Sequence, residues 1–440
     1  MKNSIRTAGF VLVMLLVVPI GRGFLLAGEE PLVTEQPATA LPVFATDAAR
    51  GFPYLLERMK GRRAFLLGDA SHGTEEYYAF RKWVTRHLIE DLGVRVWVLE
   101  AEWDSAHMVD DYIRGRLPGD KGARQMLAEA FTHWPQWVWA NEEMVEFVEY
   151  LKDFNSRLPT DRMVRCYGMD MQFAIGASLR FLAGQWPEGS VLRQKYQDLY
   201  GWWLPYLDDP MLFNQAYADG RETGSLLATE LLGAIADPSP EQRRILTMLI
   251  AAEEYYRTMS HNKYEAWNIR SHHFARYVRD LLQSREGVQG IVAWAHNSHV
   301  GDMSGSDVED TGLTSFGRLM RESLGPGKVF ILGSAGYAGT VLAATEWYEP
   351  PGVMTVPPAR EGSVEALLNG GGWDNPLLLW EDEEQARLWS SKPLWHRGIG
   401  VAYTPEAEMP SYYLTAKIAV RYDALVFWRN TRALQRMVAP

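Results

Sequence analysis

Five short apolar runs, each ending abruptly in polar residues, constrain the fold of this chain more than any other feature. They span residues 63–68, 94–99, 163–167, 290–294 and 328–332. The runs are rich in β-branched and aromatic residues, which favour buried strands, and helical patterns lie between them. This alternation of strand and helix predicts an α/β fold with a mostly parallel central sheet flanked by helices.

The residues that follow these runs predict where the function lies. In an open parallel sheet, the reactive crevice lies beyond the carboxyl ends of the strands. Four of the five runs place a carboxylate, a histidine or both at that end. These residues are Asp69, His72, Glu100, Asp170, His296 and His299. We therefore expect side chains from distant segments of the chain to converge in one pocket.

The rest of the chain divides around this sheet. Residues 175–267 are biased toward helix and rich in Leu, Tyr and Trp, which predicts a helical insertion packed over one side of the core. We expect residues 29–174 to form the first part of an α/β hydrolase core and residues 268–440 to form the second part.

Residues 1–28 have the pattern of a secretory signal peptide. Lys2 and Arg6 precede an apolar stretch, and small residues follow it before Glu29. No later segment offers the ~20 consecutive apolar residues that a membrane-spanning helix needs. We expect an exported protein, periplasmic or secreted, with no stable membrane insertion after the signal is removed. An uncleaved N-terminal anchor is the alternative.

Composition and missing motifs exclude several classes of function. The formal net charge of −11 argues against nucleic acid as a partner. The single cysteine, Cys166, excludes an internal disulfide framework, and its strand-like setting favours a buried structural thiol. The chain has no Gly-x-Ser-x-Gly, no phosphate-binding loop, no dinucleotide fingerprint and no His-Glu-x-x-His. What remains is chemistry by histidine and carboxylate side chains.

Asp69 and His72 are the first candidate pair. A carboxylate that accepts one imidazole N–H fixes the tautomer and raises the basicity of the other nitrogen. That nitrogen can then take a proton from water, as general-base catalysis requires. A loop histidine that only caps the following helix is the structural alternative.

His296 and His299 form the second cluster, again at a strand end. Two histidines three residues apart can polarise a carbonyl group or bind a metal. A zinc site needs a third protein ligand, which His72, Glu100 or Asp170 could supply. A metal-dependent hydrolase with His72, His296 and His299 as ligands is the main rival interpretation. Glu100 also follows an apolar run directly, and a buried carboxylate there needs a partner such as Arg86, Arg270 or a histidine.

Several ordered blocks give the chain a family resemblance. Residues 68–76, Gly-Asp-Ala-Ser-His-Gly-Thr-Glu-Glu, resemble the opening motif of the erythromycin esterase family. Residues 98–103 (Val-Leu-Glu-Ala-Glu-Trp), 137–143 (Trp-Val-Trp-Ala-Asn-Glu-Glu) and 294–301 (Trp-Ala-His-Asn-Ser-His-Val-Gly) are similar to its later blocks. Because the blocks appear in family order, the chain is identified as a member of that family.

The resemblance implies a macrolide lactone esterase fold and a small-molecule ester or lactone as substrate. It implies that His72 activates water without a metal or other cofactor. It implies catalytic support from Asp69, Glu100, Arg86, His296 and His299. We further expect substrate contacts from Trp103, Trp137, Asp170 and Arg270.

Two departures from the family pattern concern residues that can affect substrate choice. Asp69 stands where the first block usually has glutamate, and Ser271 stands where many members have an acid beside the equivalent of Arg270. Fold and catalytic centre do not determine what a cleft accepts. A non-catalytic binding protein on the same scaffold is therefore a further alternative.

Overall fold

The computed structural model describes residues 43–44, 48–207, 223–371, 375–380 and 383–437. The expected signal peptide, residues 1–28, lies outside this part. None of the described helices is both long enough and apolar enough to cross a membrane.

The central sheet has the predicted α/β architecture. Within the described residues, nine strands form one mixed sheet in the order β1-β8-β11-β6-β2-β5-β3-β4, with β7 paired to β6. Neighbours from β11 to β4 are parallel, whereas β1, β7 and β8 pair in antiparallel fashion. The strands are β1 (Val43–Phe44), β2 (Ala64–Asp69), β3 (Val96–Glu102), β4 (Arg165–Asp170), β5 (Ile291–His296), β6 (Val329–Ala343), β7 (Gly352–Val356), β8 (Leu377–Leu379) and β11 (Ala424–Thr431). The five apolar runs correspond to β2–β6, so that prediction is confirmed.

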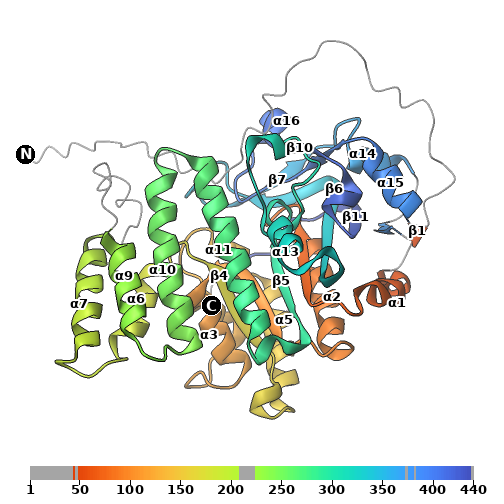
Figure 1. Cartoon of the computed structure of the whole chain (residues 1–440). Helices are drawn as coiled ribbons and strands as arrows, with labels where there is room; N and C mark the ends of the chain where they lie inside the picture. Colours follow the sequence, from red (N-terminus) through yellow and green to blue (C-terminus); the bar gives the residue numbers. More distant parts are fainter. Residues whose placement is uncertain (1–42, 45–47, 208–222, 372–374, 381–382, 438–440) are drawn as a thin grey trace, which may run out of the picture.

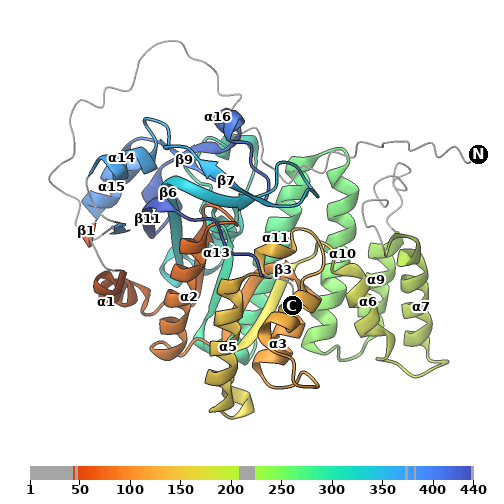
Figure 2. The same ribbon diagram turned by 180° about the vertical axis from the view of Figure 1, so that it is seen from behind.

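Helices cover both faces of the sheet (Figures 1 and 2). Side chains alternate along each strand, so Phe65 and Leu67 of β2 face one layer while Ala64 and Leu66 face the other. The first layer contains α2 (Glu75–Glu90), α3 (Trp103–Ile113), α4 (Ala123–Ala130) and α5 (Glu142–Ser156). The second contains α11 (Lys263–Gln283), α13 (Phe316–Leu324) and α14 (Val364–Gly370). Because the sheet is buried on both faces, its strands are apolar along most of their length and appear in the sequence as continuous apolar runs.

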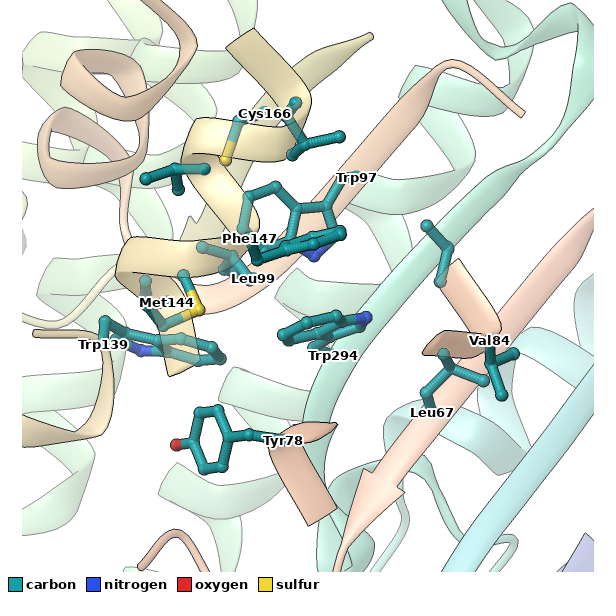
Figure 3. Close-up of a cluster of buried hydrophobic side chains, with 14 of the residues drawn as sticks. Leu67, Tyr78, Val84, Trp97, Leu99, Trp139, Met144, Phe147, Cys166 and Trp294 are labelled. Carbon is teal, nitrogen blue, oxygen red and sulfur yellow. The ribbon is translucent and has the colours of Figure 1, made fainter. Parts of the chain in front are cut away.

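An aromatic cluster fixes the first helical layer to the sheet (Figure 3). The rings of Trp97 and Trp294, on β3 and β5, lie 5.2 Å apart, and Phe147 of α5 lies 5.0 Å and 5.2 Å from them. Such aromatic pairs contribute roughly 0.5–1.5 kcal/mol each beyond the area they bury. The Trp294 indole N–H donates to Thr85 Oγ1 at 2.9 Å. Cys166 is buried in the same cluster, as expected for a structural thiol.

The helical insertion lies beyond the β4 edge of the sheet (Figure 1). It contains α6 (Ile175–Ala183), α7 (Val191–Trp203), α9 (Thr223–Ala234) and α10 (Pro240–Met259). Its own apolar core includes the fully buried Trp203. The expected boundary at residue 267 falls inside α11, which runs from Lys263 to Gln283. The start of this helix, at Ala266, packs into the insertion core, whereas Phe274 further along packs against the sheet. The helix α11 therefore contributes side chains both to the insertion core and to the layer that covers the sheet.

The C-terminal segments close over the carboxyl ends of the strands. They include a small antiparallel sheet of β9 and β10. The other described α-helices and strands are α1 (Ala48–Met59), α12 (Asn297–Val300), α15 (Glu383–Ser391), β9 (Leu394–Arg397), α16 (Glu408–Ser411), β10 (Tyr413–Ala416) and α17 (Ile418–Arg421). The backbone of Ile399, just after β9, donates to the Ala70 carbonyl at 2.7 Å. The loop after β9 therefore lies directly beside the end of β2.

Candidate active site

Asp69, the last residue of β2, is held between an arginine and a histidine. Its Oδ2 lies 2.8 Å from Arg81 Nη2, and its Oδ1 lies 3.5 Å from His72 Nδ1. Asp69 is fully buried, and Arg81 is only 2% exposed. Burial acts to raise the pKa of Asp69, but attraction to Arg81 and His72 outweighs it and lowers that pKa. Asp69 is therefore a buried, ionised carboxylate at neutral pH.

His72 faces His296 across the ends of β2 and β5. Their ring centroids lie 5.0 Å apart, with the planes tilted by 50°. Burial acts to lower the pKa of His72, but the Asp69 carboxylate outweighs it and raises that pKa. Burial and the charge of His72 lower the pKa of His296 to about 3. Two neighbouring titratable groups whose pKa values are driven apart can take different roles in proton transfer.

The tautomer of His296 follows from its local hydrogen bonds. The backbone N–H of Ser298 donates to His296 Nδ1 at 3.2 Å, and Ser298 Oγ lies 2.8 Å from the same nitrogen. A neutral imidazole that accepts at Nδ1 carries its proton on Nε2. His296 Nε2 has no hydrogen-bond partner within the described part of the chain. His296 is thus a neutral N–H donor with that hydrogen still unused.

Glu100 links β3 to β5 and to α11. Its Oε1 lies 2.9 Å from Arg270 Nη2 and 3.1 Å from His299 Nε2, and its Oε2 accepts from the His296 backbone N–H at 2.8 Å. Burial acts to raise the pKa of Glu100, but His299 and Arg270 lower it well below its usual range. This carboxylate therefore stays ionised and fixes the position of His296.

Arg270 completes the group from α11. It forms two hydrogen bonds with the Asp170 carboxylate, and its Nη1 lies 3.0 Å from His299 Nε2. His299 stacks on Trp267 with ring centroids 4.4 Å apart, and burial lowers the pKa of its imidazole. The sequence-predicted residues Asp69, His72, Glu100, Asp170, Arg270, His296 and His299 therefore lie in one connected cluster.

The arginine expected at this cluster, Arg86, lies elsewhere, and that expectation is wrong. Arg86 is exposed on α2, and its guanidinium lies 4.2 Å from the ring centre of Tyr150. Arg81 takes the place beside Asp69. Five residues along a helix turn the side chain by about 140° beyond one full rotation, so the two arginines face different sides. Arg81 belongs to the buried stripe of Tyr78, Thr85 and Leu88, a helical signal that could have identified it.

The two tryptophans expected to contact substrate do not line the cleft, which corrects that prediction. Trp103 packs against the helical insertion, stacks on His107 and donates its indole N–H to Glu241 Oε1 at 2.6 Å. Trp137 is buried in the core. The cleft is nevertheless rich in tryptophan. The tryptophans that line it are Trp134, Trp139, Trp267 and Trp347.

The cleft has two lobes that meet at His72, Glu100 and Val401. Lobe A has a volume of 790 Å³, and lobe B has a volume of 560 Å³, both counting space open to solvent. Residues lining lobe A include His296, His299, Trp267, Trp347, His396 and Arg421. Residues lining lobe B include Glu102, Asp170, Arg270, His133, Trp134 and Phe173.

A buried polar network behind lobe A, not expected from the sequence, holds the turn that contains His296. Arg421 donates from Nη2 to the Asn297 carbonyl at 3.0 Å and from Nε to the Tyr422 hydroxyl at 2.9 Å. That hydroxyl lies 3.2 Å from His396 Nε2, while His396 Nδ1 lies 2.7 Å from Glu365 Oε1. These residues are far apart in sequence, and no local pattern marks them as partners.

Gly68 allows the same turn to pack against β2. A Cβ atom at Gly68 would lie 2.2 Å from Asn297 Oδ1, which is closer than real atoms approach. The Asn297 side chain also exchanges hydrogen bonds with the Ser334 backbone. The glycine before Asp69 is therefore required for the close approach of the β2 and β5 ends.

Among the described residues, no group of three or more His, Cys, Asp or Glu side chains is arranged to hold a metal ion. His299 is engaged by Glu100 and Arg270, and His296 Nδ1 accepts from Ser298. The rival set of His72, His296 and His299 thus gains no support from this geometry.

Known proteins resemble the chain along most of its length. A family model described as "Erythromycin esterase" matches residues 89–431. The Bacillus subtilis protein named "Putative hydrolase YbfO" is 20% identical over 423 residues, which cover 88% of each chain.

Three solved structures share the fold. A mutant of the erythromycin esterase EreC in its open conformation has a TM-score of 0.64 and 16% identity, covering 90% of this chain and 96% of that one. A Bacillus cereus protein has a TM-score of 0.72 and 16% identity, covering 89% and 94%. A protein described as a succinoglycan biosynthesis protein has a TM-score of 0.70 and 15% identity, covering 89% and 93%. Because the family match spans well over half of its length, the chain belongs to the erythromycin esterase family.

Proposed function

We propose that the chain is a carboxylic-ester or lactone hydrolase in which His72 activates water. One observation carries the proposal: His72 has its Nδ1 edge toward a buried, ionised Asp69 and lies where the two lobes of the cleft meet. The opposite Nε2 edge is the one left for a water molecule. Membership of the family and the hydrolase name of the Bacillus subtilis relative support the same reaction class.

In this mechanism, His72 Nε2 takes a proton from water as the water oxygen attacks the acyl carbon. Asp69 orients the imidazole and stabilises the imidazolium that forms, which makes His72 a stronger base. Arg81 holds Asp69 ionised and in place. The 3.5 Å separation of Asp69 and His72 is long for a hydrogen bond, and such contacts commonly shorten when substrate binds.

His296 stabilises the negative charge that develops on the carbonyl oxygen. It stays neutral because its pKa is about 3, and its Nε2–H is free of partners among the described residues. A neutral imidazole can donate to an oxyanion without losing its own proton. Glu100 and the Arg421 network act as positioning groups, since both anchor the backbone around His296 and Asn297.

The test is turnover of esters and lactones by purified protein, with products identified by mass spectrometry. The panel contains p-nitrophenyl esters, alkyl esters, simple lactones and a macrolide, because the family name makes a macrolide a candidate substrate. His72→Gln is expected to lower kcat/KM by a factor on the order of 100 or more. His261→Gln is the matched control, since His261 is exposed in the turn between α10 and α11 and lines neither lobe. Equal turnover by the His72 variant and the wild type contradicts the proposal.

A binding protein without catalysis is the alternative outcome of the same panel. It predicts tight binding of a panel member without turnover by the wild type. Asp69→Glu restores the residue that the family pattern usually has at this position. Gain of turnover in that variant alone would indicate that Asp69 holds the scaffold in an inactive form.

We also propose that the protein is exported. The basic start, apolar stretch and small residues within residues 1–28 support this location. Expression with a C-terminal tag followed by N-terminal sequencing of the extracytoplasmic protein tests it. A mature chain beginning near Glu29 is expected, whereas protein found only in the cytoplasm with Met1 intact contradicts export.

A further inference from the structure

Glu102 is an acid in lobe B that the proposed mechanism leaves unused. Glu102 is the last residue of β3 and lies at the start of α3, two residues beyond Glu100. Its side chain is 16% exposed and lines lobe B together with His72 and Glu100. Lobe A contains no carboxylate besides Glu100 among its described lining residues. Among the described lining residues, only lobe B therefore has acids besides Glu100, namely Glu102 and Asp170.

Glu102 is also the acid of this cleft without an arginine. Asp69 pairs with Arg81, while Glu100 and Asp170 share Arg270. Within the described part of the chain, Glu102 Oε1 lies 3.8 Å from His133 Nδ1, and the His133 side chain is half exposed. A carboxyl group in a shielded cleft without a strong cation partner favours its neutral, proton-bearing form.

The groups around Glu102 act in the same direction. Burial raises the pKa of Glu102 to about 8, and the acids Asp104 and Asp170 add to the rise. The Glu102 backbone N–H and Ser105 oppose it with hydrogen bonds. Glu102 is therefore largely protonated at neutral pH, when Asp69 and Glu100 are ionised.

Resting on the proposed function, we infer that lobe B receives the alcohol portion of the ester and that Glu102 protonates the leaving oxygen. His72 lies at the junction of the lobes, which is where the scissile bond must lie for water to be activated there. The two sides of the ester then extend into opposite lobes. The acyl side enters lobe A, where His296 can donate to the carbonyl oxygen, and the alcohol side enters lobe B, where Glu102 lies.

The proton balance closes with water as the only co-reactant. Water gives one proton to His72 Nε2 as its oxygen bonds to the acyl carbon. The bond from that carbon to the alcohol oxygen breaks, its electron pair stays on the oxygen, and the Glu102 carboxyl proton neutralises it. The His72 imidazolium then returns its proton to Glu102 through solvent, and the carboxylic acid product releases a proton to water.

Leaving-group dependence tests this role. The probes are p-nitrophenyl butyrate, whose phenolate departs without protonation, and hexyl butyrate, whose alkoxide requires a proton. Glu102→Gln keeps the shape and removes the acid. We expect kcat/KM to fall on the order of 100-fold for hexyl butyrate and less than about threefold for p-nitrophenyl butyrate. Glu102→Asp retains an acid and is expected to recover part of the hexyl butyrate activity.

The outcomes separate the two proposals. Glu57→Gln is the control, because Glu57 is an exposed acid on α1 that lines neither lobe. Equal losses of Glu102→Gln on both esters, or no loss on either, overturn the role of Glu102 while leaving the His72 mechanism standing. Failure of the wild type to hydrolyse either ester or any member of the wider panel overturns the proposed function and this inference with it. Thermal unfolding of each variant shows whether it is folded.

Discussion

The imidazole rings of His72 and His296 lie 5.0 Å apart at the ends of two adjacent parallel strands. One is made more basic by a carboxylate, and the other is kept neutral by burial. This pairing gives one base and one hydrogen-bond donor at neutral pH from two residues of the same type.

Arg81 and Arg86 form a matched pair for testing the site geometry. Arg81→Met leaves the buried Asp69 carboxylate without its cation, so we expect a loss of about 3–5 kcal/mol in the free energy of unfolding. Arg86→Met removes an exposed contact with Tyr150 and should cost less than about 1 kcal/mol. Urea unfolding at pH 7 measures both. Similar losses for the two variants would contradict the placement of Arg81.

His296 is expected to act on the rate more than on binding. His296→Asn removes the Nε2–H donor, so we expect kcat to fall on the order of 100- to 1,000-fold with a small change in KM. Steady-state kinetics on a p-nitrophenyl ester measure the split, with His261→Gln as the control. A variant with raised KM and unchanged kcat would assign His296 to substrate binding instead.

Activity is expected to survive removal of metals. Glu100 and Arg270 already engage His299, so His72, His296 and His299 are poorly arranged as a zinc set. Dialysis against a strong chelator should leave ester hydrolysis within about twofold, since general-base catalysis by histidine needs no ion. Loss of activity that added zinc or manganese restores, together with stoichiometric metal by elemental analysis, would favour the metal-dependent alternative.

The fold and most of the site could be predicted from sequence because their signals are local. A strand buried on both faces must be apolar throughout, and the residue after it emerges at the edge where parallel strands meet. This explains why Asp69, Glu100, Asp170 and His296 could be assigned to one site from runs far apart in the chain. The apolar pattern of each strand and the polar residue at its end were sufficient to predict these four positions.

The errors concern features that a local pattern does not encode. The assignment of Arg86 to the site was an error of helical phase, because Arg81 and not Arg86 lies in the buried stripe of α2. Trp103 and Trp137 lie beside site residues in the sequence, yet tertiary packing places both in apolar cores. The partners Glu365 and His396 meet Arg421 and Asn297 only in the folded chain. Glu102 was not predicted, because its pKa depends on burial and on the neighbouring acids Asp104 and Asp170, which no sequence motif reveals.

The dependence of rate on pH tests the role of His72 most directly. The base must be unprotonated, so kcat/KM should rise with pH through the pKa of His72, which the Asp69 carboxylate raises above its usual value. In Asp69→Asn that attraction is gone and burial is left to lower the pKa. The acidic limb of the profile for a p-nitrophenyl ester is therefore predicted to move to lower pH, and the plateau to fall on the order of 100-fold or more. An acidic limb at the same pH in the wild type and in Asp69→Asn would contradict the account.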